Sequence, residues 1–246
     1  MIQLENICKQ YTNHNHTVRA VDNVSFSVAP NERVGIAGGS GSGKSTLLRL
    51  IALLEKPTSG NLWLFGEDVT SIQNHTEIYR FMQMMFQNPL AVIPPRMNLE
   101  AFLLEPYINY GLMDIAAAKD DIRKWIQHVD LPETIVQKYP HEVSGGQLQR
   151  LVLARIMLMH PKLVLFDEPT SALDAVNQKL VLDLLQKLYT EQPFGYIFVS
   201  HDIGLLQAVT DRIIVMKDGQ IVETIESKRL KEAVHPYTQA LVEASV

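Results

Sequence analysis

The sequence predicts an α/β domain with an inserted helical block, and three observations predict it. Short apolar segments with the character of buried strands alternate with segments of helical periodicity over the 246 residues. One such strand runs into a glycine-rich loop that opens a helix. Between residues 88 and 140, prolines cluster and helical patterns replace strands. We expect one domain, with residues 1–87 and 161–246 as its core and residues 88–160 as a helical subdomain.

The expected strands of the first third are apolar runs bounded by polar or glycine-rich turns. They cover residues 4–10, 18–28, 33–37, 62–65 and 81–86, and residues 46–54 have the periodicity of a helix. The strand 81–86 contains three methionines. A binding patch would be one explanation, but core packing is the better one because methionine fills irregular core space.

The remaining elements follow the same patterns. In the helical block we expect helices at residues 99–111 and 116–129, and a further apolar, basic helix that opens near residue 144. The last third is expected to form a strand, a helix, a strand and a hairpin, at residues 163–166, 177–190, 196–199 and 213–224.

Composition narrows the class of protein. The formal net charge of -5 and the pI near 5.9 argue against a nucleic-acid binder, which usually carries a basic excess. Cys8 is the only cysteine, so no internal disulfide can form. The amino terminus lacks the pattern of a signal peptide, and no apolar run approaches membrane-spanning length. We therefore expect a soluble, cytoplasmic protein that acts at a membrane only through a partner.

The glycine-rich loop carries the first functional signal. It consists of Gly38, Gly39, Ser40, Gly41, Ser42, Gly43, Lys44, Ser45 and Thr46. Glycines allow backbone N–H groups to converge on phosphate oxygens, and the helix N-terminus adds partial positive charge. Lys44 can reach the β- and γ-phosphates, and Ser45 can bind Mg²⁺. The alternative is a plain glycine-rich turn, but the lysine, the serine, the strand before and the helix after all match a phosphate-binding loop.

Two acids end the apolar strand near residue 165. In proteins with such a loop, an aspartate at this strand end holds Mg²⁺, and we assign this role to Asp167. Glu168 is then placed to polarise the attacking water, which predicts a hydrolase. Solvated acids at a strand end are the alternative, and their pairing with an intact phosphate loop argues against it. No Asn-Lys-x-Asp segment for guanine is present, so ATP is favoured over GTP.

A second phosphate-binding surface is predicted at the start of the helix near residue 144. Its residues are Ser144, Gly145, Gly146 and Gln147. A serine and two glycines that open a basic, apolar helix are typical of an anion site. One chain with two such surfaces, far apart in sequence, predicts that two copies hold a nucleotide between them.

Four further polar side chains are candidates for the site. Gln87 follows the strand 81–86 and could bind Mg²⁺ or the lytic water. His201 could contact the γ-phosphate, although a lone histidine is more often structural. Asp174 follows the two acids closely enough to lie at a subunit junction. Tyr11 could stack on adenine, and a surface aromatic of a hairpin is the alternative.

These residues, in this order, resemble the motif set of the ATP-binding-cassette (ABC) ATPase family over essentially the whole chain. The resemblance implies a P-loop, RecA-like ATPase core with an N-terminal antiparallel β-subdomain and an inserted helical subdomain that carries the signature motif. It implies ATP and Mg²⁺ as the bound groups. Asp174 and His201 match the dimer-junction aspartate and the switch histidine of the family.

The resemblance implies roles for the other candidates as well. Tyr11 resembles the adenine-stacking aromatic, and Gln87 resembles the glutamine that couples the ATP site to a transmembrane partner. Ser144 and Gly146 resemble the signature contacts to the γ-phosphate bound by the opposite subunit. Val143 departs from the leucine usual in the family, but it is also apolar.

Four segments carry a narrower resemblance, to the ATPase subunits of peptide and nickel importers. They are Phe-Gln-Asn-Pro at residues 86–89, Pro-Arg-Met at 95–97, Tyr-Pro-His-Glu at 139–142 and His-Pro-Tyr-Thr-Gln-Ala-Leu at 235–241. This resemblance implies an importer subunit peripheral to the cytoplasmic face of the membrane. Its implied partners are a second ATPase chain, in a heterodimer rather than a homodimer, two transmembrane permease subunits and an extracytoplasmic binding protein.

The expected cargo is nickel, cobalt, a metal chelate or a peptide. Many peptide-importer ATPases continue beyond the tail with a cysteine cluster, and the sequence ends at Val246 without one, which favours the metals. The competing class is a soluble ATP-driven machine of DNA repair or translation. Such relatives usually carry two cassettes or a long coiled coil, and neither is visible here.

Overall fold

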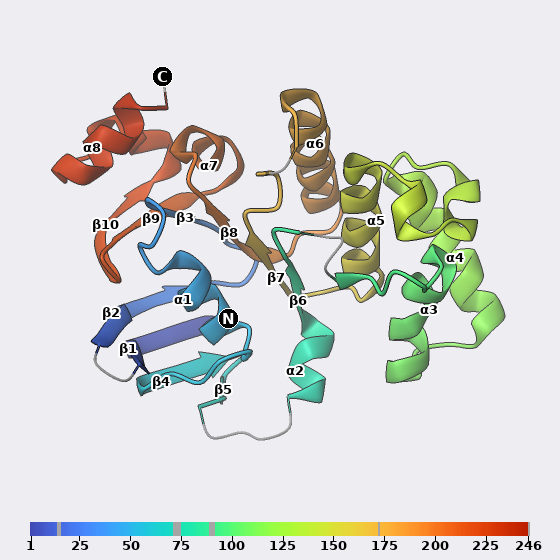
Figure 1. The fold of residues 1–246 in the computed structure, drawn as a ribbon, viewed down its shortest axis with the longest axis horizontal. Helices are drawn as coiled ribbons and strands as arrows, with labels where there is room; N and C mark the ends of the chain where they lie inside the picture. Colours follow the sequence, from blue (N-terminus) through green and yellow to red (C-terminus); the bar gives the residue numbers. More distant parts are fainter. Residues whose placement is uncertain (14–15, 71–74, 89–91, 172, 246) are drawn as a thin grey trace. The chain divides into compact units, whose positions relative to one another are not determined.

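The structure is a computed structural model that describes residues 1–13, 16–70, 75–88, 92–171 and 173–245 (Figure 1). Pro89, of the segment 86–89, lies outside the described residues. The chain forms two compact units. Unit 1 comprises Met1–Met82, Lys162–Glu168 and Phe194–Val246, and unit 2 comprises Gln83–Pro161 and Pro169–Pro193. Residues 169–193, which we expected in the core, therefore group with the helical segment.

Unit 1 contains an antiparallel sheet built mainly from the amino-terminal strands. Its strands are β1 (Ile2–Asn13), β2 (His16–Val28), β4 (Ser59–Leu64) and β5 (Glu67–Asp68), in the order β2-β1-β4-β5. Ile2 pairs with Val28 on one side and with Leu64 on the other, and all three side chains are buried. Ile2 and Leu4 are buried and Gln3 between them is exposed, which is the period of two expected for a strand with one covered face. The predicted strands at residues 4–10, 18–28 and 62–65 are confirmed.

The second sheet of unit 1 is mostly parallel. Its strands in this unit are β3 (Arg33–Ala37), β7 (Leu163–Asp167), β8 (Gly195–Ser200), β9 (Arg212–Lys217) and β10 (Gln220–Glu226), in the order β10-β9-β3-β8-β7. β3, β7, β8 and β9 run parallel, and β10 returns antiparallel to β9. Residues of β7 and β8 are buried throughout, as expected of parallel strands covered on both faces.

The register of this sheet places the carboxyl ends of three strands at one edge. Ala37 of β3 pairs with Ser200 of β8, and Asp167 of β7 pairs with Val199 of β8. The residues that follow β3, β7 and β8 therefore meet at this edge. This edge holds the phosphate loop, Glu168 and His201, as the strand patterns predicted.

The described residues of unit 1 also form the α-helices α1 (Lys44–Ile51), α2 (Thr76–Phe81), α7 (Ile203–Val209) and α8 (Pro236–Glu243), and the 3-10 helix η4 (Ser227–Glu232). The helix predicted at residues 46–54 is confirmed as α1. The sequence patterns did not predict α2, α7 and α8. They have six, seven and eight residues, and none of them follows a phosphate loop of the kind that marks the start of α1, which also has eight residues.

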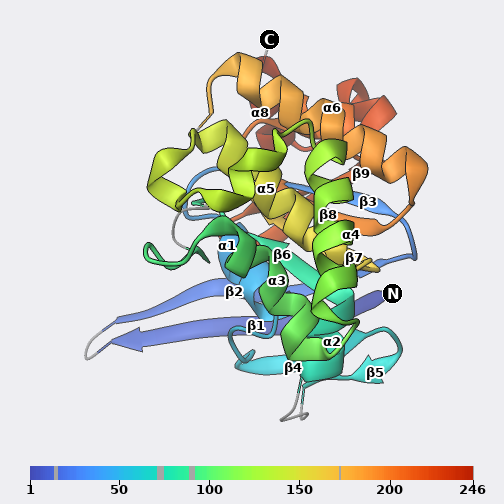
Figure 2. The same cartoon turned by 90° about the vertical axis from the view of Figure 1, so that its right-hand side faces the viewer.

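Unit 2 is mainly helical. It contains α3 (Leu99–Tyr110), α4 (Ile115–His128), η2 (Glu133–Gln137), η3 (Pro140–Glu142), α5 (Gly145–Leu158) and α6 (Ala175–Glu191), and β6 (Met82–Met85) begins one residue before the unit. α4 packs against α3 and α5, and α5 packs against α6 (Figure 2). Each α-helix begins at a capping side chain, provided by Asn98, Asp114, Ser144 and Asp174. The predicted helices of the block are confirmed. Among the described residues, no helix is long and apolar enough to cross a bilayer.

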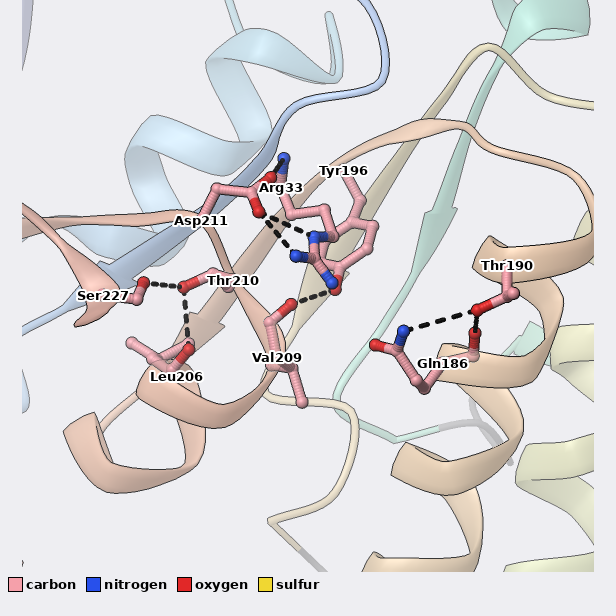
Figure 3. A network of polar contacts seen from close by, with 9 residues as sticks. All are labelled: Arg33, Gln186, Thr190, Tyr196, Leu206, Val209, Thr210, Asp211 and Ser227. Carbon is pink, nitrogen blue, oxygen red and sulfur yellow. Dashed lines mark hydrogen bonds and ion pairs between the residues drawn. The ribbon is translucent and has the colours of Figure 1, made fainter.

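A polar network ties the start of β3 to the segment that links α7 to β9 (Figure 3). The backbone N–H and the guanidinium of Arg33 donate to the Asp211 carboxylate, and the Tyr196 hydroxyl donates to the carbonyl of Val209. Thr210 Oγ1 donates to the carbonyl of Leu206 at 2.7 Å and lies 3.0 Å from Ser227 Oγ. These bonds span up to 178 residues of sequence, and they fix the strand from which the phosphate loop departs.

Two threonines offer a matched test of this network. Thr210 is buried, whereas Thr190 is exposed, yet both hydroxyls donate to the carbonyl four residues earlier (Figure 3). We expect Thr210→Val to lower the free energy of unfolding by about 1–3 kcal/mol, because Ser227 loses a buried partner. Thr190→Val should change it by less than about 0.5 kcal/mol. Urea unfolding followed by circular dichroism measures both, and equal losses would contradict the role of the network.

Candidate functional site

The phosphate loop lies between β3 and α1. Some of its glycines allow a close approach of neighbouring main chain, and another leaves the backbone accessible. A Cβ on Gly38 would lie 2.3 Å from the carbonyl oxygen of Met216, and one on Gly43 would lie 2.1 Å from that of Ala20. Both therefore permit a close approach of the main chain. Gly41 has φ of 79°, and among the described residues no atom lies within 4 Å of where its Cβ would be. The backbone there is open to an approaching phosphate oxygen.

Lys44, the first residue of α1, is held against the loop. Its Nζ donates to the carbonyl oxygens of Gly38 and Gly39, at 2.8 and 2.9 Å, and the residue is only 6% exposed. Burial lowers the pKa of Lys44, while the carboxylates of Glu168 and Asp167 act in the opposite direction. The hydrogen bonds of this ammonium within the described part of the chain go to carbonyl and hydroxyl oxygens, so it is well suited to bind phosphate oxygens.

A side-chain oxygen of Ser45 and one of Asp167 lie close together beside the phosphate loop. Ser45 Oγ donates to Asp167 Oδ1 at 3.0 Å, across 122 residues of sequence. Burial raises the pKa of Asp167, although the bond from Ser45 and the charge of Arg49 lower it. The described residues contain no cluster of three or more His, Cys, Asp or Glu side chains able to hold a metal. Mg²⁺ takes one or two protein oxygens and completes its shell with water and phosphates, so this pair fits it.

Glu168 and His201 meet at the sheet edge described above. Glu168 has a left-handed backbone with φ of 46°, and its N–H donates to the carbonyl of Val199 at 3.1 Å. Its Oε2 lies 3.4 Å from His201 Nδ1, and the imidazole is 65% exposed. A non-glycine residue in this conformation is uncommon and turns the chain sharply after β7. The two side chains are therefore close enough to act on one water molecule.

Tyr11 lies beside α1, the helix that follows the phosphate loop. Its hydroxyl donates to the Glu55 carboxylate, and the Lys9 ammonium lies 5.1 Å from the ring centroid. Burial and the bond to Glu55 raise the pKa of Tyr11, and a bond with Thr46 acts in the opposite direction. The contact with Thr46 places Tyr11 at the first turn of α1, and 39% of the residue is exposed. Its ring can therefore accept a stacked base.

In unit 2, Ser144 is the cap of α5. Its Oγ accepts the N–H of Gln147 at 3.3 Å, and Gln147 Oε1 accepts the N–H of Ser144 at 3.0 Å, which forms a capping box. A Cβ on Gly145 would meet no described atom within 4 Å, whereas one on Gly146 would lie 2.6 Å from Asn177 Oδ1 of α6. Among the described residues, the start of α5 is therefore open at Gly145 and closed by Asn177 at Gly146.

The other two candidates of unit 2 lie near the start of α6. Asp174 caps α6 by accepting the N–H groups of Val176 and Asn177, and the bonds from Asn177 lower the pKa of Asp174. Gln87 Nε2 donates to Ser171 Oγ at 3.3 Å. The contact between Gly146 and Asn177 thus joins the Ser144 segment to the helix that Asp174 begins.

The candidates divide between the two units. Unit 1 brings together Tyr11, the phosphate loop, Asp167, Glu168 and His201, and unit 2 holds Gln87, Ser144, Gly145, Gly146, Gln147 and Asp174. Sequence reasoning assigned no role to Arg49, Asn177 or Tyr237. The charge of Arg49 acts on Asp167, Asn177 lies against Gly146, and Tyr237 accepts the N–H of Gly39. The only signal for Tyr237 was its place in the tail segment 235–241.

Comparison with protein families and relatives gives a consistent result. The ABC transporter family model matches residues 21–171. The oligopeptide transport ATP-binding protein AppF of Bacillus subtilis is 37% identical over 92% of this chain and 70% of its own length. A putative peptide import ATP-binding protein of Brucella ovis is 36% identical over 99% and 78%, and the di/tripeptide transport ATP-binding protein DppF of Pseudomonas aeruginosa is 38% identical over 93% and 72%.

Solved structures agree with the fold. The dimeric post-hydrolysis structure of the ATP-binding cassette MJ0796, bound to ADP and Pi, superposes with a TM-score of 0.84 and 30% identity. The match covers 92% of this chain and 99% of that one. A second dimeric structure of the same cassette gives the same TM-score at 31% identity. The predicted fold, a P-loop ATPase core with an antiparallel sheet and a helical subdomain, is confirmed.

Two aspartates with opposite pKa shifts provide a test of the site's electrostatics. Because burial raises the pKa of Asp167, its ionised form destabilises the fold, and stability is lost as pH rises from the unfolded pKa through the folded one. Because the pKa of Asp174 is lowered, its ionised form stabilises the fold, and stability is lost as pH falls through the folded pKa.

We therefore expect Asp167→Asn to raise the melting temperature at pH 7 in the absence of Mg²⁺ and nucleotide, and Asp174→Asn to lower it. Both differences should shrink toward pH 3. Differential scanning fluorimetry across this range measures them. A lower melting temperature for Asp167→Asn at pH 7 would show that its charge does not destabilise the fold.

Proposed function

This chain belongs to the ABC transporter family and is an ATPase. We propose that it energises the import of peptides through membrane subunits. The observation that supports the chemistry is the hydrogen bond between Ser45 and Asp167, which brings together two oxygens that would suit Mg²⁺. The peptide assignment is supported by relatives whose names specify oligopeptide or di/tripeptide transport. Their coverage extends over nine-tenths of this chain.

The proposed cargo differs in emphasis from the metals that the sequence analysis favoured. That preference depended on the end of the chain, whereas the reported relatives are peptide transport proteins. None of them is a machine of DNA repair or translation, and we do not propose that class. The proposed location is the cytoplasmic face of the membrane, where the chain docks on two permease subunits supplied by a peptide-binding protein.

Within one subunit, each candidate residue is given a chemical task. Lys44 would bind the β- and γ-phosphates of ATP, and Ser45 and Asp167 would hold Mg²⁺, which neutralises phosphate charge when bound. Glu168 would accept the proton of the attacking water as the general base. His201 would orient that water and the γ-phosphate from its position 3.4 Å from the Glu168 carboxylate.

The remaining candidates bind the nucleotide or relay its state. Tyr11 would stack on adenine with its exposed ring. Gln87 would bind Mg²⁺ or the lytic water and couple the site to the permease. Ser144 and Gly146 would contact the γ-phosphate of ATP held by the opposite subunit, with the N-terminus of α5 supplying partial positive charge. Asp174 would lie at the junction between the two subunits.

A dimer is therefore part of the proposed mechanism. The similar cassette MJ0796 is dimeric, which supports the pairing, and we favour a second, related ATPase chain as the partner. Two ATP molecules bind the closed dimer better than the open one and shift the population toward closure. Hydrolysis removes this preference and reopens the dimer. The permeases that dock on the subunits alternate with this cycle.

The roles of Glu168 and Lys44 are separable by measurement. We expect Glu168→Gln to slow phosphate release by about 10²–10⁴-fold with ATP affinity intact, because only the general base is lost. Lys44→Ala should lose ATP binding itself. Glu133→Gln, an exposed change in η2, is the matched control and should hydrolyse at the unmodified rate. Isothermal titration and a phosphate-release assay measure the two properties, and normal hydrolysis by Glu168→Gln would refute its role.

The cargo is tested in the assembled transporter. The chain is purified in detergent with the permease and binding-protein subunits that accompany it, and the complex is reconstituted in nanodiscs. We expect binding protein loaded with a peptide library to raise ATPase activity several-fold, and binding protein loaded with Ni²⁺ or a nickel chelate to leave it unchanged. Stimulation by nickel alone would overturn the peptide assignment. Stimulation by DNA or ribosomes without any membrane subunit would overturn transport.

A further inference from the structure

The carboxyl-terminal helix makes a direct contact with the phosphate loop. The hydroxyl of Tyr237, in α8, accepts the backbone N–H of Gly39 at 2.8 Å, across 198 residues of sequence. A Cβ on Gly39 would lie 3.1 Å from the same oxygen, so the loop approaches the ring closely. Gly39 is also a residue whose carbonyl accepts the Lys44 ammonium. The Gly39 residue is thus held by its N–H through Tyr237 and by its carbonyl through Lys44.

Strand β9, which also borders the phosphate loop, contacts the ring of Tyr237. The Lys217 ammonium, at the end of β9, lies 5.2 Å from the centroid of the Tyr237 ring, which is a cation–π distance. The preceding residue, Met216, is the one whose carbonyl approaches Gly38. The end of β9 therefore supports the tail helix and the start of the loop together.

The start of the tail helix is anchored to the same sheet. Glu223 of β10 accepts the N–H groups of Val234 and His235, at 2.8 and 3.2 Å. His235 Nδ1 caps α8 by accepting the N–H of Tyr237 at 3.1 Å. Thr238, the next residue, is fully buried. These contacts hold the start of α8 in one position. The position of the Tyr237 hydroxyl is therefore determined by the fold.

We propose that Tyr237 is a positioning residue of the ATP site, which holds the Gly39 residue of the phosphate loop in its binding conformation. The proposal rests on the ATP-binding role of the loop. Phosphate competes for the Lys44 ammonium, so the bond from Gly39 to Tyr237 is the contact that persists when Lys44 binds ATP. The tail helix thereby stabilises the loop before and after ATP binds, which reduces the ordering cost of binding. By linkage, ATP should stabilise the tail in return.

The test removes one hydroxyl and follows one amide. Tyr237→Phe keeps the ring over Lys217 and deletes the acceptor of the Gly39 N–H. Tyr79→Phe is the matched control, because it removes a tyrosine hydroxyl of the same unit that donates to the carbonyl of Leu53. Each full-length variant is labelled with ¹⁵N-glycine, which gives 13 candidate signals, and the Gly39 amide is followed by NMR.

We expect Tyr237→Phe to shift the Gly39 amide, to speed its hydrogen exchange and to weaken ATP affinity by about 2- to 10-fold, the worth of one hydrogen bond. The hydrolysis rate at saturating ATP should stay within about twofold, because the catalytic carboxylates are unchanged. Tyr79→Phe should alter none of these. Glu223→Ala, which releases the start of the tail, should weaken ATP affinity in the same direction without touching the loop.

Two results would overturn the proposal. One is an unmoved Gly39 amide in Tyr237→Phe, which would show that the contact does not form in solution. The other is a shifted amide with unchanged ATP affinity, which would reduce the contact to a structural one. If the unmodified chain itself binds no ATP, the proposed function fails, and the amide signal still reports separately on the contact.

Discussion

The parallel pairing of β3 with β8, and of β8 with β7, is the constraint on which the site depends. Because the strands run in one direction, the segments that leave their carboxyl ends meet at one edge of the sheet. One segment supplies the phosphate loop, one supplies the acids and one supplies His201. The polar network around Thr210 and Asp211 secures the first of these strands at its other end. Strand register thus determines the distances between candidate site residues that are far apart in sequence.

The same edge concentrates charge in a place that water reaches poorly. Lys44 and Asp167 are both buried. Burial lowers the pKa of Lys44 and raises the pKa of Asp167, so in both residues it favours the neutral form. Such groups cost stability in the chain alone, because desolvation disfavours their charged forms. In the proposed function, phosphate and Mg²⁺ would supply the opposite charges for these groups. The site would then favour its ligand at some expense to the stability of the fold, which is a common arrangement in binding sites.

Much of this site could be predicted from local sequence. The loop, Glu168 and His201 directly follow apolar strands, and Asp167 is the last residue of one. The caps of α5 and α6 were readable in the same way, since Ser144 and Asp174 precede helical patterns. The short helices α2, α7 and α8 could not be predicted, because each spans only about two turns and no phosphate loop precedes it to mark its start.

Contacts across long sequence separations could not be predicted. Tyr237 on Gly39 and Asn177 against Gly146 arise from tertiary packing, and neither residue has a local signature. The grouping of residues 169–193 with the helical unit has the same origin, because the packing of α6 on α5 decides it. Cargo is a separate matter, since in the proposed function the cargo would contact other subunits and not this chain.

The two adjacent glycines of the α5 start differ in the substitutions that they permit. A Cβ on Gly145 would meet no atom of the described part of the chain within 4 Å, so a larger side chain there causes no steric conflict with it. A Cβ on Gly146 would lie 2.6 Å from Asn177 Oδ1, so the two positions form one steric unit. A larger residue at position 146 therefore requires a smaller or differently oriented side chain at position 177. We expect substitutions at these two positions to be tolerated together more readily than singly.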